Sequence, residues 1–262
     1  MTNDTVDKDI LRKRFAKAVI TYDRQAAVQK DIARRMCEML KLSASGDTFS
    51  KVFEAGCGTG IFTEMIDSIF HPDMLYINDI CPEMGDEAGK KAKNAVFICG
   101  DAETIDFPEG LTLITSCSAI QWFTDFDAFL SKCNEALADG GMLAFSTFGE
   151  DNLKEIKQLT GAGLNYMRLN DLEESLRDNG FNISVSKQEK TKIWFPSPVE
   201  VLRHLKETGV TATGRNKGKN TWTKGTLETF ADEYRKTYGQ KDGSVPVTYH
   251  PIYIISTKDT TH

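Results

Sequence analysis

The sequence predicts an α/β protein built on a mostly parallel β-sheet, and three observations lead to that prediction. Between residues 50 and 150, short apolar runs alternate with stretches of helical periodicity, as in a parallel sheet covered by helices on both faces. A glycine-rich turn, EAGCGTG at 54–60, joins the first such run to the first such helix. The 262 residues, 40% of them hydrophobic, suffice for one core of ordinary size. We therefore expect one domain spanning 1–262.

The sheet begins with five strands. Each run is short and apolar, and turn or helix-start residues follow it. The five runs are KVFEA (51–55), MLYIND (74–79), AVFICG (95–100), LTLITSCS (111–118) and MLAFSTFG (142–149).

Three helices are expected between and after these strands. Apolar residues recur at helical spacing over 61–70 and over 124–141, where two terminal glycines serve as a stop signal. The segment 170–180 opens with capping-box spacing and closes on a glycine, so it is predicted to be a third helix.

Two further strands are expected in the last third of the chain, over 182–195 and 247–256, although Pro251 disturbs the second one. The intervening segment, about 196–244, is too long for a hairpin loop. We expect this insertion and the helical segment 1–44 to form a small lid over the sheet.

Charge and hydropathy exclude two classes of partner, namely nucleic acids and membranes. The formal net charge is −6, whereas a nucleic-acid-binding surface needs a concentrated excess of basic residues. The chain contains no run of about 18 apolar residues that could cross a bilayer. Its N-terminal segment also lacks the apolar stretch that is typical of secretory signals. We therefore expect a cytoplasmic protein that binds neither nucleic acid nor a membrane.

Cysteine and histidine spacing gives no sign of a metal site. No two cysteines form a C-x-x-C pair, and the four histidines are far apart. We expect free, mostly buried thiols in a reducing compartment. The cysteines are Cys37, Cys57, Cys81, Cys99, Cys117 and Cys133.

The glycine-rich turn has the context of a cofactor-binding turn, because a strand precedes it and a helix follows. Gly56 and Gly58 would let the backbone bend sharply and approach a ligand, and the helix beyond Gly60 would present free N–H groups. A tight turn with no ligand is the alternative. The residues of this turn expected at the cofactor are Glu54, Ala55, Gly56, Cys57 and Gly58.

Acidic residues at the strand ends indicate which cofactor is bound. Asp79 ends the second strand, where a carboxylate can accept hydrogen bonds from ribose hydroxyls, and this would suit NAD equally well. Glu54, however, would repel a pyrophosphate and attract the cationic methionine end of S-adenosylmethionine. Asp101, after the third strand, could accept from an adenine amino group. The pattern favours S-adenosylmethionine, with Ile80 and Ala102 beside these acids.

This arrangement resembles the Rossmann-like class I S-adenosylmethionine-dependent methyltransferases, whose sheet has seven strands with the last one antiparallel. Over most of the chain, the sequence is similar to the malonyl-[acyl-carrier protein] O-methyltransferases of biotin synthesis. EAGCGTG is common to many methyltransferases, whereas the combination of TYD, SAIQW and LRHLKETG is much more particular. The matching segments are FAKAVITYDRQAAVQKDIA (15–33), EAGCGTG, GDAE (100–103), SAIQW (118–122), GGMLAFSTFGEDNLKE (140–155), LRHLKETGVTATGR (202–215) and VTYHPIYII (247–255).

The resemblance implies methyl transfer from S-adenosylmethionine to the free carboxylate of malonyl-acyl-carrier protein, or of malonyl-CoA. The methyl ester would prime pimeloyl synthesis. Three alternatives stay open at this point: a methyltransferase for another small acid such as an aconitate-type acid, a cofactor-sensing protein without catalytic activity, and an NAD-dependent oxidoreductase.

The resemblance also suggests site residues. Arg203 would pair with the substrate carboxylate, because guanidinium matches a carboxylate with two parallel hydrogen bonds. Tyr22 would belong to the covered active site, Trp122 would lie where the methyl acceptor binds, and Ser118 would contact the cofactor. The alternatives are a solvated arginine, a structural tyrosine and a core tryptophan.

An acyl carrier protein is acidic, so docking would need local positive charge on this acidic chain. Two basic clusters could supply it, although such runs are often only solvated faces. They comprise Arg12, Lys13, Arg14 and Lys17 in the first helix, and Arg203, Lys206, Arg215, Lys217 and Lys219 in the insertion. One departure from the family pattern is NDICPEMGDEAGKK (78–91), whose Pro82, Gly85 and Gly89 predict a poorer helix.

Overall fold

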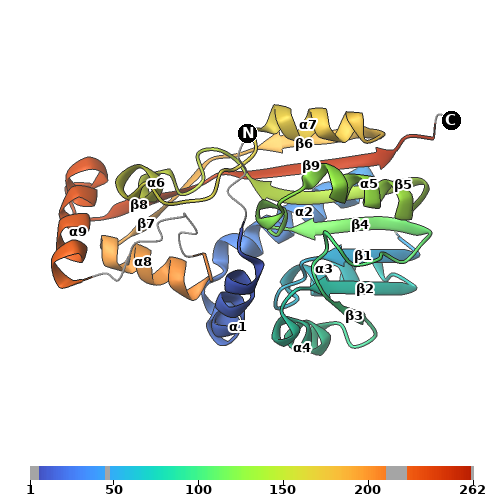
Figure 1. The fold of residues 1–262 in the computed structure, drawn as a ribbon, viewed down its shortest axis with the longest axis horizontal. Helices are drawn as coiled ribbons and strands as arrows, with labels where there is room; N and C mark the ends of the chain where they lie inside the picture. The colour runs from blue at the N-terminus through green and yellow to red at the C-terminus, as the bar shows by residue number, and fades with distance from the viewer. Residues whose placement is uncertain (1–5, 45–47, 211–222, 261–262) are drawn as a thin grey trace.

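The fold contains a seven-stranded sheet at its centre (Figure 1). The structure is a computed structural model, and it describes residues 6–44, 48–210 and 223–260. The sheet order is β3-β2-β1-β4-β5-β9-β6, and only β9 runs antiparallel to its neighbours. This confirms the seven-stranded, mostly parallel sheet with an antiparallel last strand. Its strands are β1 (Lys51–Ala55), β2 (Met74–Asp79), β3 (Val96–Cys99), β4 (Leu111–Cys117), β5 (Leu137–Phe148), β6 (Phe181–Gln188) and β9 (Pro251–Lys258).

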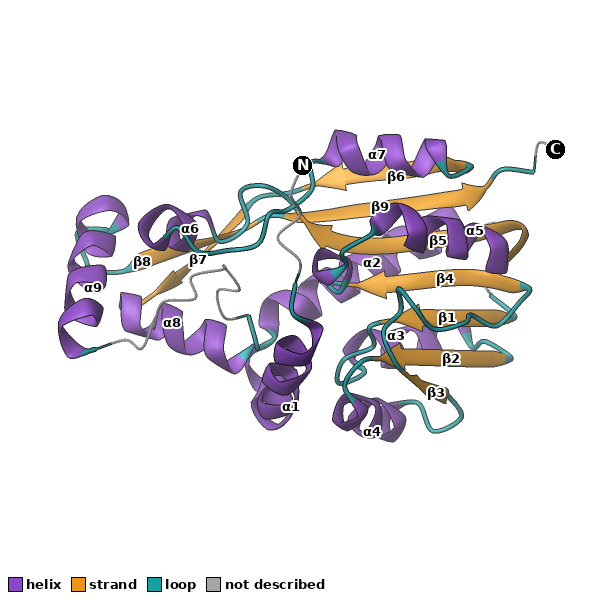
Figure 2. Ribbon diagram, in the orientation of Figure 1, coloured by secondary structure: helices purple, strands orange, loops and turns teal. Residues whose placement is uncertain are grey.

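Helices cover both faces of this sheet (Figure 2). Because successive side chains of a strand point to opposite faces, Val52 belongs to one apolar cluster and Phe53 to the other. Helices α2 (Ala27–Ser43) and α3 (Ile61–Phe70) contribute to the first cluster, whereas α5 (Phe126–Ala136) and α7 (Leu169–Asp178) contribute to the second. The cores therefore lie between the sheet and its two helical layers.

The last two expected strands are each divided in two. The segment 182–195 forms β6 and then β7 (Thr191–Phe195), and the segment 247–256 forms β8 (Val245–Tyr249) and then β9. Strands β7 and β8 pair only with each other, as a separate two-stranded antiparallel sheet. Pro251 has no N–H to donate to a ladder, and the strand is interrupted immediately before it. Sequence periodicity did not reveal this change of partner.

Four further helices, α1, α6, α8 and α9, lie on the side of the sheet where β7 and β8 extend (Figure 1). Helix α1 (Lys8–Gln25) begins at the side-chain cap of Asp7 and contacts α4 (Pro82–Lys91) and α8 (Pro198–Glu207). Along the chain, α8 and α9 (Lys224–Tyr238) come between β7 and β8, and α9 contacts α6 (Lys154–Thr160).

One expectation about helices is wrong, and packing explains how a second segment forms a helix despite its low propensity. The helix expected over 124–141 ends at Ala136, because residues from Leu137 onward join β5 and pair with β4. The segment after β2, expected to be a poor helix, forms α4. Gly85 is needed there, since a Cβ at this position would lie 2.2 Å from the Phe97 ring. Packing against β3 thus offsets the low helix propensity of this glycine.

Membrane-spanning helices, metal-ligand groups and disulfides were not expected, and the structure can be compared with these expectations only over its described residues. None of its helices is long and apolar enough to cross a membrane. Its His, Cys, Asp and Glu residues form no group of three or more that could hold a metal ion. The six cysteines are free, and four of them are buried.

Candidate active site

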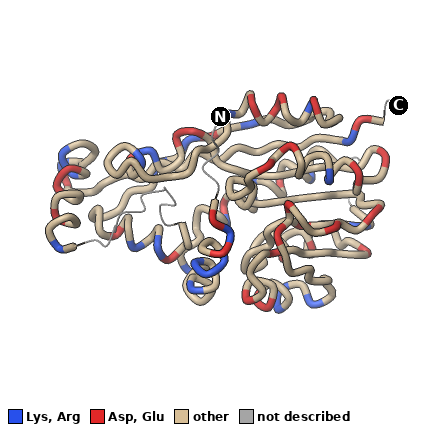
Figure 3. Tube along the Cα trace, viewed as in Figure 1, with Lys and Arg blue, Asp and Glu red and all other residues tan. Residues whose placement is uncertain are grey.

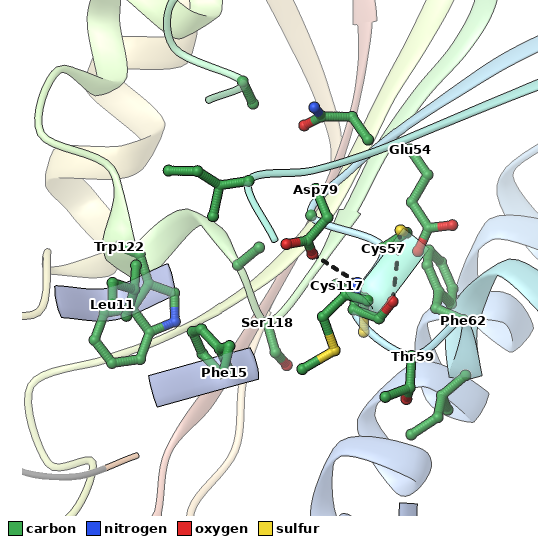
Figure 4. Close-up of a pocket in the computed structure, with 18 of the residues that line it drawn as sticks. Leu11, Phe15, Glu54, Cys57, Thr59, Phe62, Asp79, Cys117, Ser118 and Trp122 are labelled. Atoms are coloured by element: carbon green, nitrogen blue, oxygen red, sulfur yellow. Dashed lines mark hydrogen bonds between the residues drawn. The ribbon is translucent and has the colours of Figure 1, made fainter. Parts of the chain in front are cut away.

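A large pocket lies where the carboxyl ends of β1, β2 and β4 meet α1 (Figure 4). Its empty volume of about 890 Å³, which includes its mouth, is in the range that accommodates cofactors. Figure 4 shows Leu11, Phe15 and Trp122 on one side of Asp79, and Glu54 and Phe62 on the other. Ligand binding at the carboxyl ends of parallel strands is the general rule in open α/β sheets.

The glycine-rich turn is shaped by two close backbone approaches. Gly56 has φ 73°, and a Cβ there would lie only 2.4 Å from the Cβ of Ala119. Gly60 has φ 82°, and a Cβ there would lie 2.7 Å from the Cα of Ala88. Any larger residue would be both strained and obstructed at these two positions. The turn therefore packs closely against Ala119 and Ala88, lines the pocket and leads directly into α3.

Asp79 holds this turn to the end of β2. Its carboxylate accepts hydrogen bonds from the backbone N–H groups of Gly58 and Cys81, both at 2.9 Å. Burial raises the pKa of Asp79 to about 6, although these N–H donors favour the charged form. A carboxylate has about four acceptor positions, so Asp79 can still accept from a ligand in the pocket.

Three buried polar atoms in the pocket wall have no hydrogen-bond partner among the described residues: Gln29 Oε1, Glu54 Oε1 and Ser118 Oγ. Thr63 donates to the other oxygen of Glu54 at 2.6 Å. Burial raises the pKa of Glu54 to about 7. Unpartnered buried acceptors are costly unless a ligand satisfies them. This set of acceptors suits a cationic, hydrogen-bond-donating group.

Helix α1 closes the pocket from above. The ring of Phe15 meets Trp122 edge to face, with centroids 5.7 Å apart, and Trp122 is 6% exposed. Tyr22 lines the same pocket, and burial raises the pKa of its phenol, which keeps it protonated. The three aromatic side chains form an apolar cover that displaces water.

An ion-pair network fastens the start of α1 to the loops at the pocket rim. Lys8 Nζ lies 2.5 Å from Glu103 and 3.3 Å from Asp101, and it lies over the Phe123 ring. Glu103 also accepts from the backbone N–H groups of Thr124 and Asp125, at 2.7 and 2.6 Å. The first turn of α1 and the wall of the pocket are therefore held together.

The structure brings most of the sequence-predicted site residues together. Ala55 and Arg203 are the two that do not line the pocket: Ala55 is fully buried in β1, and Arg203 lies on α8, 58% exposed and paired with Glu200 at 2.9 Å. The predicted residues that line the pocket are Tyr22, Glu54, Gly56, Cys57, Gly58, Asp79, Ile80, Asp101, Ala102, Ser118 and Trp122.

Sequence reasoning missed several pocket residues, of which Lys8, Phe15 and Gln29 are the most informative. All three come from the two amino-terminal helices, far in the chain from the glycine-rich turn. Gln29 stands among apolar residues at helical spacing, and a polar residue on the buried face of an amphipathic helix was the signal available.

Comparisons with known proteins agree with this geometry. Residues 53–145 match the family described as "Methyltransferase domain". The chain is 43% identical to a malonyl-[acyl-carrier protein] O-methyltransferase of Bacteroides thetaiotaomicron, over 97% of this chain and 99% of that one. It is 38% identical to the protein of the same name from Haemophilus influenzae, over 96% and 95%. A third protein of this name, from Bacteroides fragilis, is 44% identical over 96% of this chain, which spans 50% of that relative.

Solved structures show the same fold. The YcgJ protein of Bacillus subtilis superposes with a TM-score of 0.62 at 15% identity, over 86% of this chain and 99% of that one. A phosphoethanolamine N-methyltransferase of Haemonchus contortus, in complex with S-adenosylhomocysteine, superposes with a TM-score of 0.54 at 17% identity, over 87% and 53%. With identity of this level along almost its whole length, the chain belongs to the malonyl-[acyl-carrier protein] O-methyltransferase family.

Proposed function

We propose that this protein transfers a methyl group from S-adenosylmethionine to the free carboxylate of malonyl-acyl-carrier protein. The malonyl methyl ester would then prime the pimeloyl chain of biotin. The observation that carries this proposal is the extent of the similarity. The general methyltransferase match ends at residue 145, whereas the malonyl-specific relatives also match α1, α2 and the segment around α8 and α9. Substrate choice in this fold depends on such flanking elements.

The pocket residues fit the proposed cofactor. S-adenosylmethionine, when bound, supplies a methyl group on a positively charged sulfur. Glu54 would accept from its ammonium group, Asp79 from its ribose hydroxyls and Asp101 from its adenine amino group. The unpartnered oxygen of Glu54 supports the first of these roles.

The acceptor needs no general base in this proposal. A malonyl carboxylate is ionised at neutral pH, so no proton has to be removed before its oxygen attacks the methyl carbon. Tyr22 stays protonated and would serve as a hydrogen-bond donor. The cover formed by Phe15 and Trp122 would exclude water, which would otherwise solvate the carboxylate and weaken its attack. The work of the protein is therefore positioning.

Helices α1, α2, α8 and α9 would together act as the lid. This lid would close the reaction chamber. Of the predicted basic clusters, Arg203 and Lys206 are exposed on α8, and Figure 3 shows basic positions along α1 as well. We propose that they dock the acidic carrier protein. Arg215, Lys217 and Lys219 lie outside the described residues.

Pairing of Arg203 with the malonyl carboxylate, which the resemblance implies, is the alternative to this docking role. It would require the guanidinium to leave Glu200, because Arg203 lines no pocket in this conformation. Malonyl-CoA would be a second substrate of the same reaction. We also propose a cytoplasmic location, because a reducing compartment suits the free cysteines.

The direct test is incubation with labelled S-adenosylmethionine and malonyl-acyl-carrier protein, followed by mass analysis. We expect a gain of one methyl group on the malonyl moiety, with malonyl-CoA as a parallel substrate. Methylation of a free acid such as aconitate, with none on either malonyl thioester, would contradict the proposal.

A further inference from the structure

A second cavity shares Trp122 with the cofactor pocket. It has an empty volume of about 370 Å³, including its mouth, and it is formed by α6, the segment after α6 and the end of α8. Apolar side chains make up most of its wall, and Asn152, Lys157 and Tyr166 are its main polar members. A small ligand in this cavity would lie against the tryptophan that borders the cofactor.

Lys157 lines this cavity, and no carboxylate of the described residues forms an ion pair with its ammonium. Its ammonium donates to the carbonyl oxygen of Leu164 and to Oδ1 of Asn165, both at 3.2 Å. Both acceptors are neutral, and within the described ranges the Lys157 ammonium pairs with no carboxylate. By contrast, Lys154 on the same helix pairs with Asp151. The charge of Lys157 is therefore available to an anionic ligand.

The aliphatic part of Lys157 lies against the segment that follows α6. Its aliphatic stem passes beside Gly163, where an added Cβ would lie 3.5 Å from three of its carbons. Nearby, the hydroxyl of Tyr166 accepts from Asn152 Nδ2 at 2.9 Å. Among the described residues this hydroxyl donates to no acceptor, so it too could donate to a ligand. The cavity thus combines an apolar wall with two donors.

Arg203 does not supply charge to this cavity. Leu205 lines the cavity, and Arg203 precedes it by two helical positions, which places the two side chains on nearly opposite faces of α8. Lys157 is the cation that does line the cavity, as far as the described residues show.

From these observations we infer that the second cavity is the acceptor site. The malonyl group of the thioester lies against Trp122, the Lys157 ammonium neutralises its carboxylate, and Tyr166 donates to one of its oxygens. This inference rests on the proposed function, and it identifies the residues that hold the substrate of that reaction. It makes Lys157 a substrate-binding residue that the sequence motifs did not indicate.

The first test is substitution of the ammonium. Lys157→Met keeps the length and apolar stem of the side chain, so we expect kcat/KM for malonyl-CoA and malonyl-acyl-carrier protein to fall about tenfold or more. Affinity for S-adenosylhomocysteine should not change. Lys154→Met, on the same helix but outside the cavity, is the matched control and should behave as the wild type. Lys157→Met activity within about twofold of that control would overturn the inference.

The second test isolates the carboxylate, because acetyl-CoA is malonyl-CoA without that group. In the presence of S-adenosylhomocysteine, the wild type should bind malonyl-CoA more tightly than acetyl-CoA. Lys157→Met should lose this preference while it keeps its affinity for acetyl-CoA, and Lys157→Arg should keep part of it. An undiminished preference in Lys157→Met would overturn the inference.

The two tests also separate this inference from the proposed function. A wild-type protein that methylates neither malonyl thioester would contradict the proposed function and, with it, the inference. A wild-type protein that methylates both, with an equally active Lys157→Met variant, would overturn the inference alone.

Discussion

At the scale of single residues, Glu54 is a pocket group whose ionisation depends on the fold. It is 1% exposed, and burial raises its pKa from 4.5 to about 7. The folded protein therefore holds a proton there that the unfolded chain has already released at the same pH. Stability from this group is complete below about pH 4.5 and is lost as the pH rises through about 7.

This shift predicts a pH effect on the protein without cofactor. Between pH 5 and pH 8, the contribution of Glu54 to the free energy of unfolding should fall by on the order of 3 kcal/mol. Glu54→Gln should remove that part of the pH dependence, as measured by urea unfolding at both pH values. Glu64→Gln, an exposed position on α3, should retain it. Identical pH profiles for the two variants would show that Glu54 does not titrate in this way.

Gln29 allows a prediction that separates a ligand contact from a structural role. Its buried Oε1 has no partner among the described residues, and we expect it to accept from the ammonium group of the cofactor. Gln29→Met should weaken S-adenosylhomocysteine binding roughly tenfold, while stability stays equal or rises because an unpaired buried amide is removed. Titration calorimetry and thermal unfolding measure the two effects. Gln25→Met, on α1 and outside the pocket, is the control, and loss of stability without loss of affinity would contradict the expectation.

At the scale of secondary-structure elements, the link between α1 and the pocket rim controls access to the cofactor. Lys8 pairs with Glu103 and Asp101, and the side chain of Glu103 is 7% exposed. Breaking this network should let the start of α1 open more often without unfolding the sheet.

We therefore predict that Lys8→Met increases the dissociation rate of S-adenosylhomocysteine about fivefold, which corresponds to about 1 kcal/mol for a partly buried ion pair. Stopped-flow displacement measures this rate. Lys17→Met, an exposed position later in α1, should leave the rate unchanged. Equal rates in both variants would mean that the network does not hold the helix closed.

Elements also show where reading the sequence succeeded. The first four strands were predicted close to their observed bounds, because buried parallel strands form short apolar runs with clear turns. The fifth, expected over 142–149, begins five residues earlier, at Leu137. The helix expected over 124–141 was too long, since pairing of Leu137 with Leu111 in β4 determines where α5 gives way to β5. The division of 182–195 into β6 and β7 was not visible, because both parts alternate in the same way.

At the scale of the whole molecule, the proposed function requires this acidic protein to bind an acidic carrier. We predict that Arg203→Ala raises KM for malonyl-acyl-carrier protein several-fold at low salt and leaves malonyl-CoA kinetics unchanged, because a docking cation contacts only the carrier. Arg235→Ala is the matched control, since Arg235 on α9 makes the same type of pair, with Asp232. Equal losses with both substrates would instead indicate that Arg203 pairs with the malonyl carboxylate.

The sequence by itself determined the sheet, the glycine-rich turn and the acids at the strand ends, because these depend on local periodicity and on the chemistry of neighbouring residues. It also indicated that Tyr22 and Trp122 belong to one site, through resemblance. Only the tertiary structure decided that Lys8, Gln29 and Lys157 face cavities whereas Arg203 faces solvent. Whether a polar side chain on a helix is buried or solvated depends on which elements pack around that helix, and these contacts join segments far apart in the chain.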